Sequence, residues 1–429
     1  MTKPADAART NGILTPTSMN SDAETSKDGA PTTDQDIILI AAHGDVVLHV
    51  EHELKPGSVL RSAFRVSSPI LKTSSKYYAR LLDGRFGEGA YVEEKHKHLR
   101  EQYATITETP SSELPVLKIS DIGRISSVKS IEALMSDFLY ILHRKDTQSF
   151  PPLTNIANLA IVADRFDAIE AVRVHVKRKK LLKAIDGKTT ARQDAGLSED
   201  KVRQRILVAT LLDYAPWLEK YTTRLITRGW VGGEPSLTGA LWWDLPSRIE
   251  EELSYRRDCV LETIQSLQSH FLELYMSRER QCRLGYDSSA QCDSFQLGEM
   301  VRFFMRIGTL QLTGTIIDDT EPVSLSSDDL SALLDKLRQV PEYQIDKHHH
   351  HCGIRTRITP LLDTIQATLP YIGVCADCWS EDRARSLWIN EKRPLLWKRQ
   401  AFNLRLQGHG SRHEGVKAMF MARERDWSG

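Results

Sequence analysis

Residues 44–88, GDVVLHVEHELKPGSVLRSAFRVSSPILKTSSKYYARLLDGRFGE, decide the fold of the first part of the chain. They open on an apolar strand over residues 45–50, and a polar link leads to a second strand over residues 63–66. The Ser-Ser-Pro sequence at residues 67–69 predicts a helix start, because serine can cap a free amide and proline fits the first turn. One continuous helix with an apolar stripe is then expected, ending at the Asp-Gly pair of residues 83–84.

The order of these elements resembles the first half of a BTB/POZ domain, most closely the fungal members of that family. The helix is followed by a Phe-x-Glu turn at residues 86–88, and LAIVADRF at residues 159–166 is similar to the helix pair that closes the fold. The resemblance covers residues 37–180. It implies an α+β domain for protein–protein interaction that in many members dimerises, and in some links a substrate to a cullin ubiquitin ligase.

Residues 90–113 interrupt this resemblance with a run rich in Glu, Lys, His and Thr. We interpret them as an exposed insertion, disordered or forming a surface helix, with one charged helical turn within residues 92–103. A strand over residues 114–119 follows, and apolar residues three and four apart predict further helices. These helices cover residues 127–144, 153–163 and 165–176.

The remaining chain divides into segments of different composition. Residues 1–36 contain almost no large apolar side chain and are expected to be disordered. Residues 181–200 are predicted as a polar linker, and residues 201–390 as a mainly α-helical C-terminal region. Residues 391–429 are interpreted as a basic tail. The longest helical pattern covers residues 246–280, and the others cover residues 202–214, 218–226, 297–307, 330–340 and 355–368.

The composition bounds the class of protein. The 429 residues carry a formal net charge of +0 and are 41% hydrophobic, which excludes a globally basic nucleic-acid binder but supplies enough apolar surface for cores. The N-terminus lacks an apolar leader and no run approaches a membrane span of about 20 apolar residues, so we expect a cytoplasmic or nuclear protein without a membrane partner. The phosphate-binding, zinc-protease and serine-hydrolase motifs are all absent, which predicts that the chain is not an enzyme.

A Cys-x-x-C motif at Cys375 and Cys378 suggests a structural zinc site, because two ligands of one tetrahedron can come from one tight turn. We predict Cys352 as a third ligand and His351 as the fourth. Adjacent residues do not easily reach one metal, so Cys282 or Cys292 remains an alternative. The favoured interpretation is that no cofactor is bound, the cysteines being small buried hydrophobes and the histidine run solvated.

Phe86 and Glu88 are the predicted partner-binding residues. The resemblance implies an aromatic anchor for an apolar groove on a cullin, with the carboxylate fixing its direction, whereas the alternative is that Phe86 packs under its own domain. The leading hypothesis is an adaptor or scaffold whose partners are a second copy of itself, a cullin and an unknown substrate protein. The alternative is a nuclear, self-associating regulator with DNA-associated partners. The basic run at residues 177–180 and the basic tail would support this alternative. Direct nucleic-acid binding is not expected.

Overall fold

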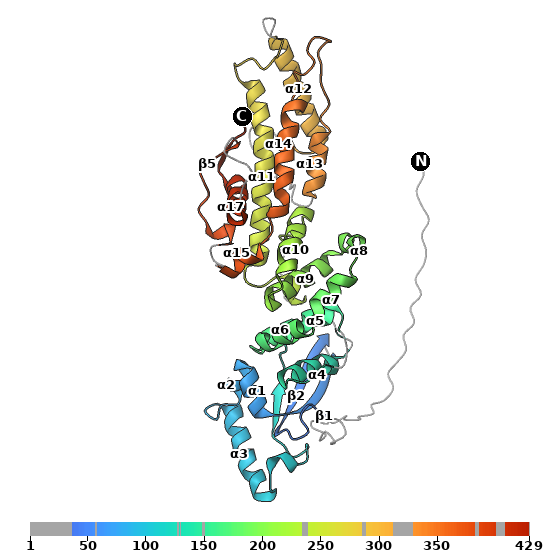
Figure 1. The fold of residues 1–429 in the computed structure, drawn as a ribbon, viewed down its shortest axis with the longest axis vertical. Helices are drawn as coiled ribbons and strands as arrows, with labels where there is room; N and C mark the ends of the chain where they lie inside the picture. The colour runs from blue at the N-terminus through green and yellow to red at the C-terminus, as the bar shows by residue number, and fades with distance from the viewer. Residues whose placement is uncertain are drawn as a thin grey trace, which may run out of the picture.

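The computed structural model describes residues 37–55, 58–126, 128, 130–147, 151–233, 239–284, 289–311, 329–381, 386–399 and 408–428. A small N-terminal sheet is followed by a mainly helical region, which confirms the coarse fold prediction. Figure 1 shows an elongated molecule with the sheet at one end and the longest helices at the other. The segment expected to be disordered, residues 1–36, lies outside the described residues, as does the polar link at residues 56–57.

The four-stranded sheet has the order β1-β3-β2-β4. Strands β2 and β3 form an antiparallel hairpin in which Val46 lies opposite Val66, while β1 runs parallel to β3 and β4 runs parallel to β2. Both strands of the hairpin are longer than predicted. The four strands are β1 (Ile37–Leu39), β2 (Val46–Lys55), β3 (Ser58–Val66) and β4 (Val116–Ile119).

Both faces of this sheet are covered, because side chains along a strand alternate between its two faces. Val46, Leu48 and Phe64 face the main core, whereas Val47 and Ala63 belong to a second, smaller cluster. Leu99, from the segment predicted to be an exposed insertion, and Leu114, at the start of the predicted strand, complete that second cluster.

Of the two alternatives given for the insertion, disorder or a surface helix, the structure has the helix, and it is longer than the one turn expected. Helix α3 (Gly87–Gln102) runs for 16 residues, and Leu99 is buried against the outer face of the sheet. The rest of the helix is strongly charged and carries only a weak apolar stripe, so helical periodicity did not indicate it.

The single helix predicted before it is also corrected: the structure has α1 (Ser68–Ser74) and α2 (Lys76–Leu81), separated by an extended Ser75. The Ser75 Oγ accepts from the Tyr78 amide at 3.1 Å and donates to the Phe166 carbonyl at 2.6 Å. Proline does lie in the first turn of α1, but Ser67 makes no side-chain cap. The Asp45 carboxylate instead accepts a hydrogen bond from the Ser68 amide, at 2.7 Å, in the first turn of the helix.

Three helices close the N-terminal unit, which we define as residues 37–178. They are α4 (Ile131–Leu142), α5 (Leu153–Arg165) and α6 (Ile169–Arg178). Phe166, at the end of α5, is fully buried. Its ring stacks on Tyr78 with centroids 5.3 Å apart and on Phe138 with centroids 5.5 Å apart.

The predicted linker is helical. It forms α7 (Leu181–Lys188) and α8 (Ala191–Ala195), which are followed by α9 (Glu199–Leu212) and α10 (Ala215–Arg228). Asp194 holds α8 to α10, because its carboxylate accepts from the Tyr221 hydroxyl and from the Arg224 guanidinium, each at 2.6 Å. The junction is therefore ordered by polar contacts that an apolar pattern does not indicate.

Helix α11 (Ile249–Met276) is the spine of the C-terminal region, which we define as residues 199–428. Glu252 and Arg256 on this helix are buried, and the Arg256 Nε donates to the Glu252 carboxylate at 2.6 Å. Among the described residues, no helix combines the length and the apolar character that crossing a bilayer requires. Helix α11 packs against α12 (Ala290–Arg306) and lies beside α14 (Arg355–Thr368), whose other neighbour is α13 (Leu330–Arg338).

The described residues of the predicted basic tail pack against α11. Trp397, Phe420 and Trp427 are buried, and the Trp427 ring donates to the Ser266 hydroxyl of α11 at 3.2 Å. The aromatic residues of this segment therefore belong to the core. Its elements are β5 (Leu396–Lys398), α17 (His409–Met421) and β6 (Glu424–Asp426), preceded by α15 (Ala376–Glu381).

Candidate functional site

The predicted partner-binding residues lie together at the start of α3. Phe86 is 53% exposed and immediately precedes the helix, while Glu88 is exposed in its first turn. Both line a groove of about 520 Å³ together with Tyr77 and Leu81 of α2. The Phe86 side chain is thus presented at the surface and does not pack under its own domain.

A short turn fixes the position of Phe86. The Phe86 amide donates to the Asp83 carbonyl at 2.9 Å. The Arg85 guanidinium binds the Asp83 carboxylate at 2.6 Å, and this hydrogen bond lowers the pKa of Asp83 to about 2. On the other side of the groove, Arg165 lies over the Tyr77 ring, 5.8 Å from its centroid. The groove therefore combines aromatic surface with charges of both signs.

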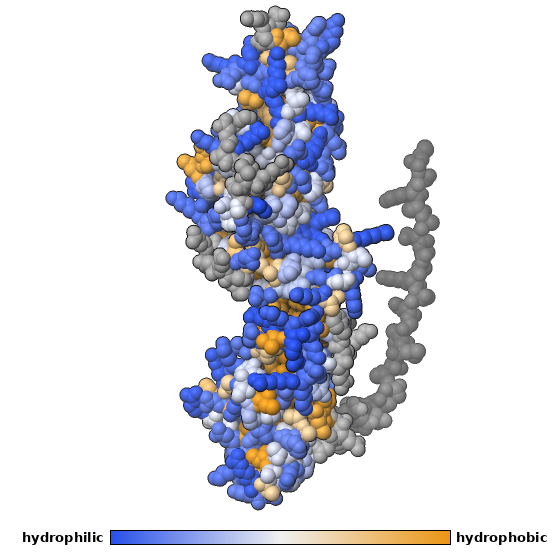
Figure 2. Space-filling view, in the orientation of Figure 1, coloured by the Kyte–Doolittle hydropathy of each residue, from blue (hydrophilic) through white to orange (hydrophobic). Residues whose placement is uncertain are grey.

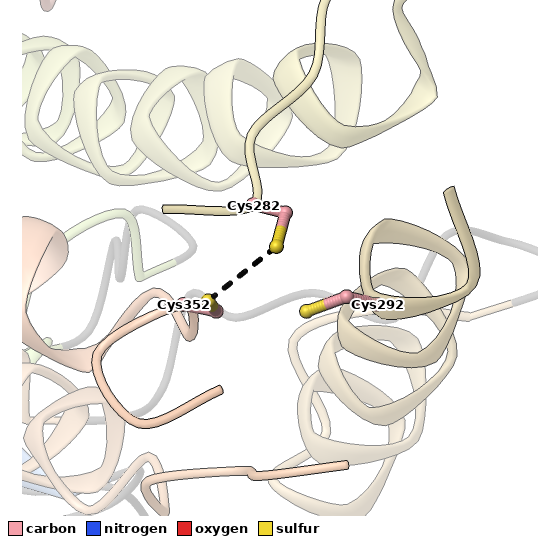
Figure 3. A group of neighbouring side chains, drawn as sticks. All are labelled: Cys282, Cys292 and Cys352. Carbon is pink, nitrogen blue, oxygen red and sulfur yellow. Dashed lines mark hydrogen bonds between the residues drawn. The ribbon is translucent and has the colours of Figure 1, made fainter. Parts of the chain in front are cut away.

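The predicted metal ligands do not form one site. Cys352 lies beside Cys282 and Cys292, the two residues that sequence analysis kept as alternatives, whereas Cys375 and Cys378 lie elsewhere. The three sulfurs are within 4.8 Å of one another, and those of Cys282 and Cys352 are 3.9 Å apart. Figure 3 shows the three side chains converging from the loop after α11, the first turn of α12 and the segment before α14.

His349, and not the predicted His351, is the histidine that interacts with Cys282. The His349 Nε2 is buried and has no hydrogen-bond partner, while its Nδ1 lies 2.8 Å from the Asp346 carboxylate. Asp346, together with the nearby Cys282 thiol, raises the pKa of His349. The His351 side chain is 59% exposed and its Nδ1 lies 3.3 Å from Glu342. We call Cys282, Cys292, His349 and Cys352 the buried cluster.

Backbone amides point at the sulfurs of the buried cluster. The Arg283 amide donates to the Cys352 Sγ at 3.4 Å. Burial disfavours the Cys282 thiolate, but hydrogen bonds from the backbone of Ser289 and Leu284 lower the pKa of this thiol. Burial raises the pKa of Cys292, and the neighbouring cysteines add to that effect. The backbone donors thus offset part of the cost of burying a charge on Cys282.

The other two predicted ligands belong to a second group on α15 and α17, which we call the C-terminal cluster. The His409 Nε2 lies 3.4 Å from the Cys375 Sγ and 3.8 Å from the Cys378 Sγ. His413 follows four residues later on α17, and its ring centroid is 4.7 Å from that of His409. The C-terminal cluster consists of Cys375, Cys378, His409 and His413.

Sequence analysis missed His349, His409 and His413. Two spacings in the sequence could have indicated them: His349-x-x-Cys352 repeats the geometry of a Cys-x-x-Cys turn, and histidines four apart share one face of a helix. Neither spacing indicates which ligands from distant segments come together. Cys282 and Cys352, for example, are 70 residues apart along the chain.

Comparison with known proteins gives no relative for this chain: no protein-family model, no curated protein and no solved structure matches it.

Proposed function

We propose that this chain is a non-enzymatic adaptor or scaffold that acts through a BTB/POZ-like N-terminal unit, and that the groove at Phe86 and Glu88 contacts a cullin N-terminal domain. The observation that carries the proposal is the exposed Phe86 ring at the mouth of this groove. An aromatic side chain that is held rigidly and half-exposed beside a carboxylate is suited to anchoring a protein interface.

The order of elements supports the proposal. The β2–β3 hairpin, the paired helices α1 and α2, strand β4 beside β2, and the closing helices α4 to α6 follow the order that the resemblance implies. Helix α3 lies where the insertion was expected, but its buried residues turn toward the sheet and leave the groove at its first turn open.

Self-association through the N-terminal unit is the second part of the proposal. Both edge strands of the sheet present apolar side chains, with Leu39 of β1 being 55% exposed and Val116 of β4 being 46% exposed. Figure 2 shows apolar side chains interrupting the polar surface over this part of the molecule. A stable dimer would bury about 1,200 Å² or more, and light scattering of the full chain should then give twice the monomer mass.

The alternative of a nuclear regulator has less support, because the basic segments use their charges within the chain. Arg178 and Lys179 both bind Asp146, at 3.0 Å and 2.9 Å. In the C-terminal segment, the Lys417 ammonium lies 2.5 Å from the Glu391 carboxylate.

Binding of the full chain to a purified cullin N-terminal domain tests the proposal, with calorimetry as the measurement. We expect Phe86→Ala to weaken binding by about 2 kcal/mol or more, because an anchor residue carries much of an interface's free energy. Glu88→Gln should weaken it less, since a charge at an interface rim contributes mainly to the rate of association.

Tyr91→Ala is the matched control, because Tyr91 is a 39% exposed aromatic residue on the same helix that does not line the groove. It should bind as the unmodified chain does. No binding at tens of micromolar would remove the cullin from the proposal, and a folded Phe86→Ala variant that binds equally well would place the contact elsewhere.

A further inference from the structure

Both clusters of cysteine and histidine lie in the C-terminal region, away from the proposed partner groove. We propose that the chain binds two structural zinc ions, one in the buried cluster and one in the C-terminal cluster. This inference does not depend on the adaptor function, because the clusters and the groove share no residue.

The spacing of the ligand atoms fits tetrahedral zinc. With Zn–S near 2.3 Å and Zn–N near 2.0–2.1 Å, two sulfurs of a tetrahedron lie about 3.8 Å apart and a sulfur and a nitrogen about 3.6 Å apart. The observed separation of the Cys282 and Cys352 sulfurs is 3.9 Å. The His409 nitrogen lies 3.4 Å and 3.8 Å from its two sulfurs, on either side of the expected value.

Each cluster draws two ligands from one tight turn and the others from elsewhere in the chain. In the buried cluster His349 and Cys352 come from one turn, and the Cys352 amide donates to the His349 carbonyl at 3.4 Å. In the C-terminal cluster, the cysteines lie at the start of α15 and the histidines lie one turn apart on α17. One turn supplies a rigid pair of ligands, and the second pair closes the tetrahedron.

The surroundings of the buried cluster are those of a metal ligand set. A zinc-bound histidine usually donates its other ring nitrogen to a carboxylate, and Asp346 occupies that position beside the His349 Nδ1. The buried Nε2 otherwise lacks a hydrogen-bond partner, which is unfavourable unless a ligand satisfies it. The Arg283 amide donates to the Cys352 Sγ at 3.4 Å, and such amide donors commonly surround the sulfur ligands of metal sites.

The mixture of ligands selects the metal. Thiolate and imidazole ligands in a tetrahedral arrangement favour Zn²⁺, whereas Mg²⁺ and Ca²⁺ require oxygen ligands. In each cluster three ligand atoms lie within 4.8 Å of one another. The proposal assigns His349 and Cys378 as the fourth ligands, which would close each coordination shell as in structural rather than catalytic zinc sites.

The two ions would stabilise the packing of opposite ends of α11 against the segments that carry Cys352 and Cys375. The Tyr275 hydroxyl, at the C-terminal end of α11, donates to the Cys352 carbonyl at 2.5 Å. Arg256, near the N-terminal end, donates to the Ile372 carbonyl at 2.9 Å, three residues before Cys375. Because zinc binds only the folded arrangement, its binding free energy adds to the stability of these ends.

Metal analysis of the full chain, purified without a polyhistidine tag and dialysed against a weak chelator, tests the proposal. We expect two zinc ions per chain. Cys292→Ser and Cys375→Ser should each reduce the content to one, and the double variant should hold none.

Two substitutions serve as matched controls. Cys259→Ser removes a buried cysteine that belongs to neither cluster, and His351→Ala removes a histidine from the run of four without touching the buried cluster. Both should keep two zinc ions, and His349→Ala should keep one.

X-ray absorption at the zinc edge keeps the test decisive if a variant fails to fold. The unmodified chain should show sulfur near 2.3 Å and nitrogen near 2.0–2.1 Å, with more sulfur than nitrogen. A chain without zinc, a shell of nitrogen and oxygen only, or zinc retained by both cysteine variants would overturn the proposal. If the chain holds a single zinc ion, the two cysteine variants show which cluster binds it. The proposal is then overturned for the other cluster.

Discussion

Aliphatic and aromatic side chains make up most of the core around the sheet of the N-terminal unit, although Arg65 is buried there too. The C-terminal region instead buries an ion pair between Glu252 and Arg256 and gathers cysteines and histidines into two clusters. In the first, Phe166 and its neighbouring rings fill the space between α2, α4 and α5. In the second, Glu252 is fully buried and the two clusters join segments that are distant in the chain. An apolar core forms from side chains that recur with the period of a strand or a helix. A core with ion pairs and clusters requires particular side chains from distant segments to come into contact.

The largest expected effect comes from breaking the buried ion pair. Glu252 accepts from Arg256 and from the amides of Trp388 at 2.7 Å and Ile389 at 3.1 Å. Glu252→Gln leaves the Arg256 charge buried and uncompensated, so the free energy of unfolding in urea should fall by about 3–5 kcal/mol.

Glu299→Gln is the matched control, because Glu299 pairs three residues away with an Arg302 that is 79% exposed. Its cost should stay below about 1 kcal/mol. The double variant Glu252→Leu, Arg256→Met should recover part of the loss. Equal costs at the buried and exposed pairs would show that the C-terminal region does not depend on its buried charges.

A smaller effect is expected in the N-terminal unit. Phe166→Leu keeps an apolar side chain but removes stacking on Tyr78 and Phe138, so it should lower the free energy of unfolding by about 1–3 kcal/mol. Zinc content should not change. A variant that releases zinc would contradict the separation between the two kinds of core.

The smallest effect is a pH dependence at the junction. Burial alone would raise the pKa of Asp194, but hydrogen bonds from Tyr221, Arg224 and Lys220 lower it to about 2. A carboxyl group with a depressed folded-state pKa stabilises the fold above pH 4 and loses this contribution as the pH falls toward 2.

Asp194→Asn should therefore lower the melting temperature at pH 7, and its difference from the unmodified chain should shrink between pH 4 and pH 2. Thermal melts across this range measure the difference. A difference that stays constant with pH would mean that the charge of Asp194 does not hold α8 to α10.

The same contrast explains how much could be predicted. The β2–β3 hairpin and helices α4 to α6 follow from alternating and helical apolar patterns. The break at Ser75 could not be predicted, because the apolar stripe continues through it and the contact that stabilises it comes from Phe166. Only one turn of helix α3 was predicted, because most of its surface is charged.

For the candidate sites, residue types were predicted better than their grouping. Phe86 and Glu88 lie in one groove, and five of the six cysteines occur in clusters. The pairing of Cys352 with Cys282, 70 residues earlier in the chain, depends on how α11, α12 and α14 pack. Spacing along the sequence carries no information about such a contact.

The most direct test of the contrast between the two regions is hydrogen exchange of the full chain with and without a strong zinc chelator. Chelation should reduce amide protection in peptides that contain Cys282, Cys352 and Cys375, and in the first turns of α12 and α17. Protection of β2 and β3 in the N-terminal unit should stay the same. Unchanged protection around the cysteines, or an equal loss over both regions, would contradict the account.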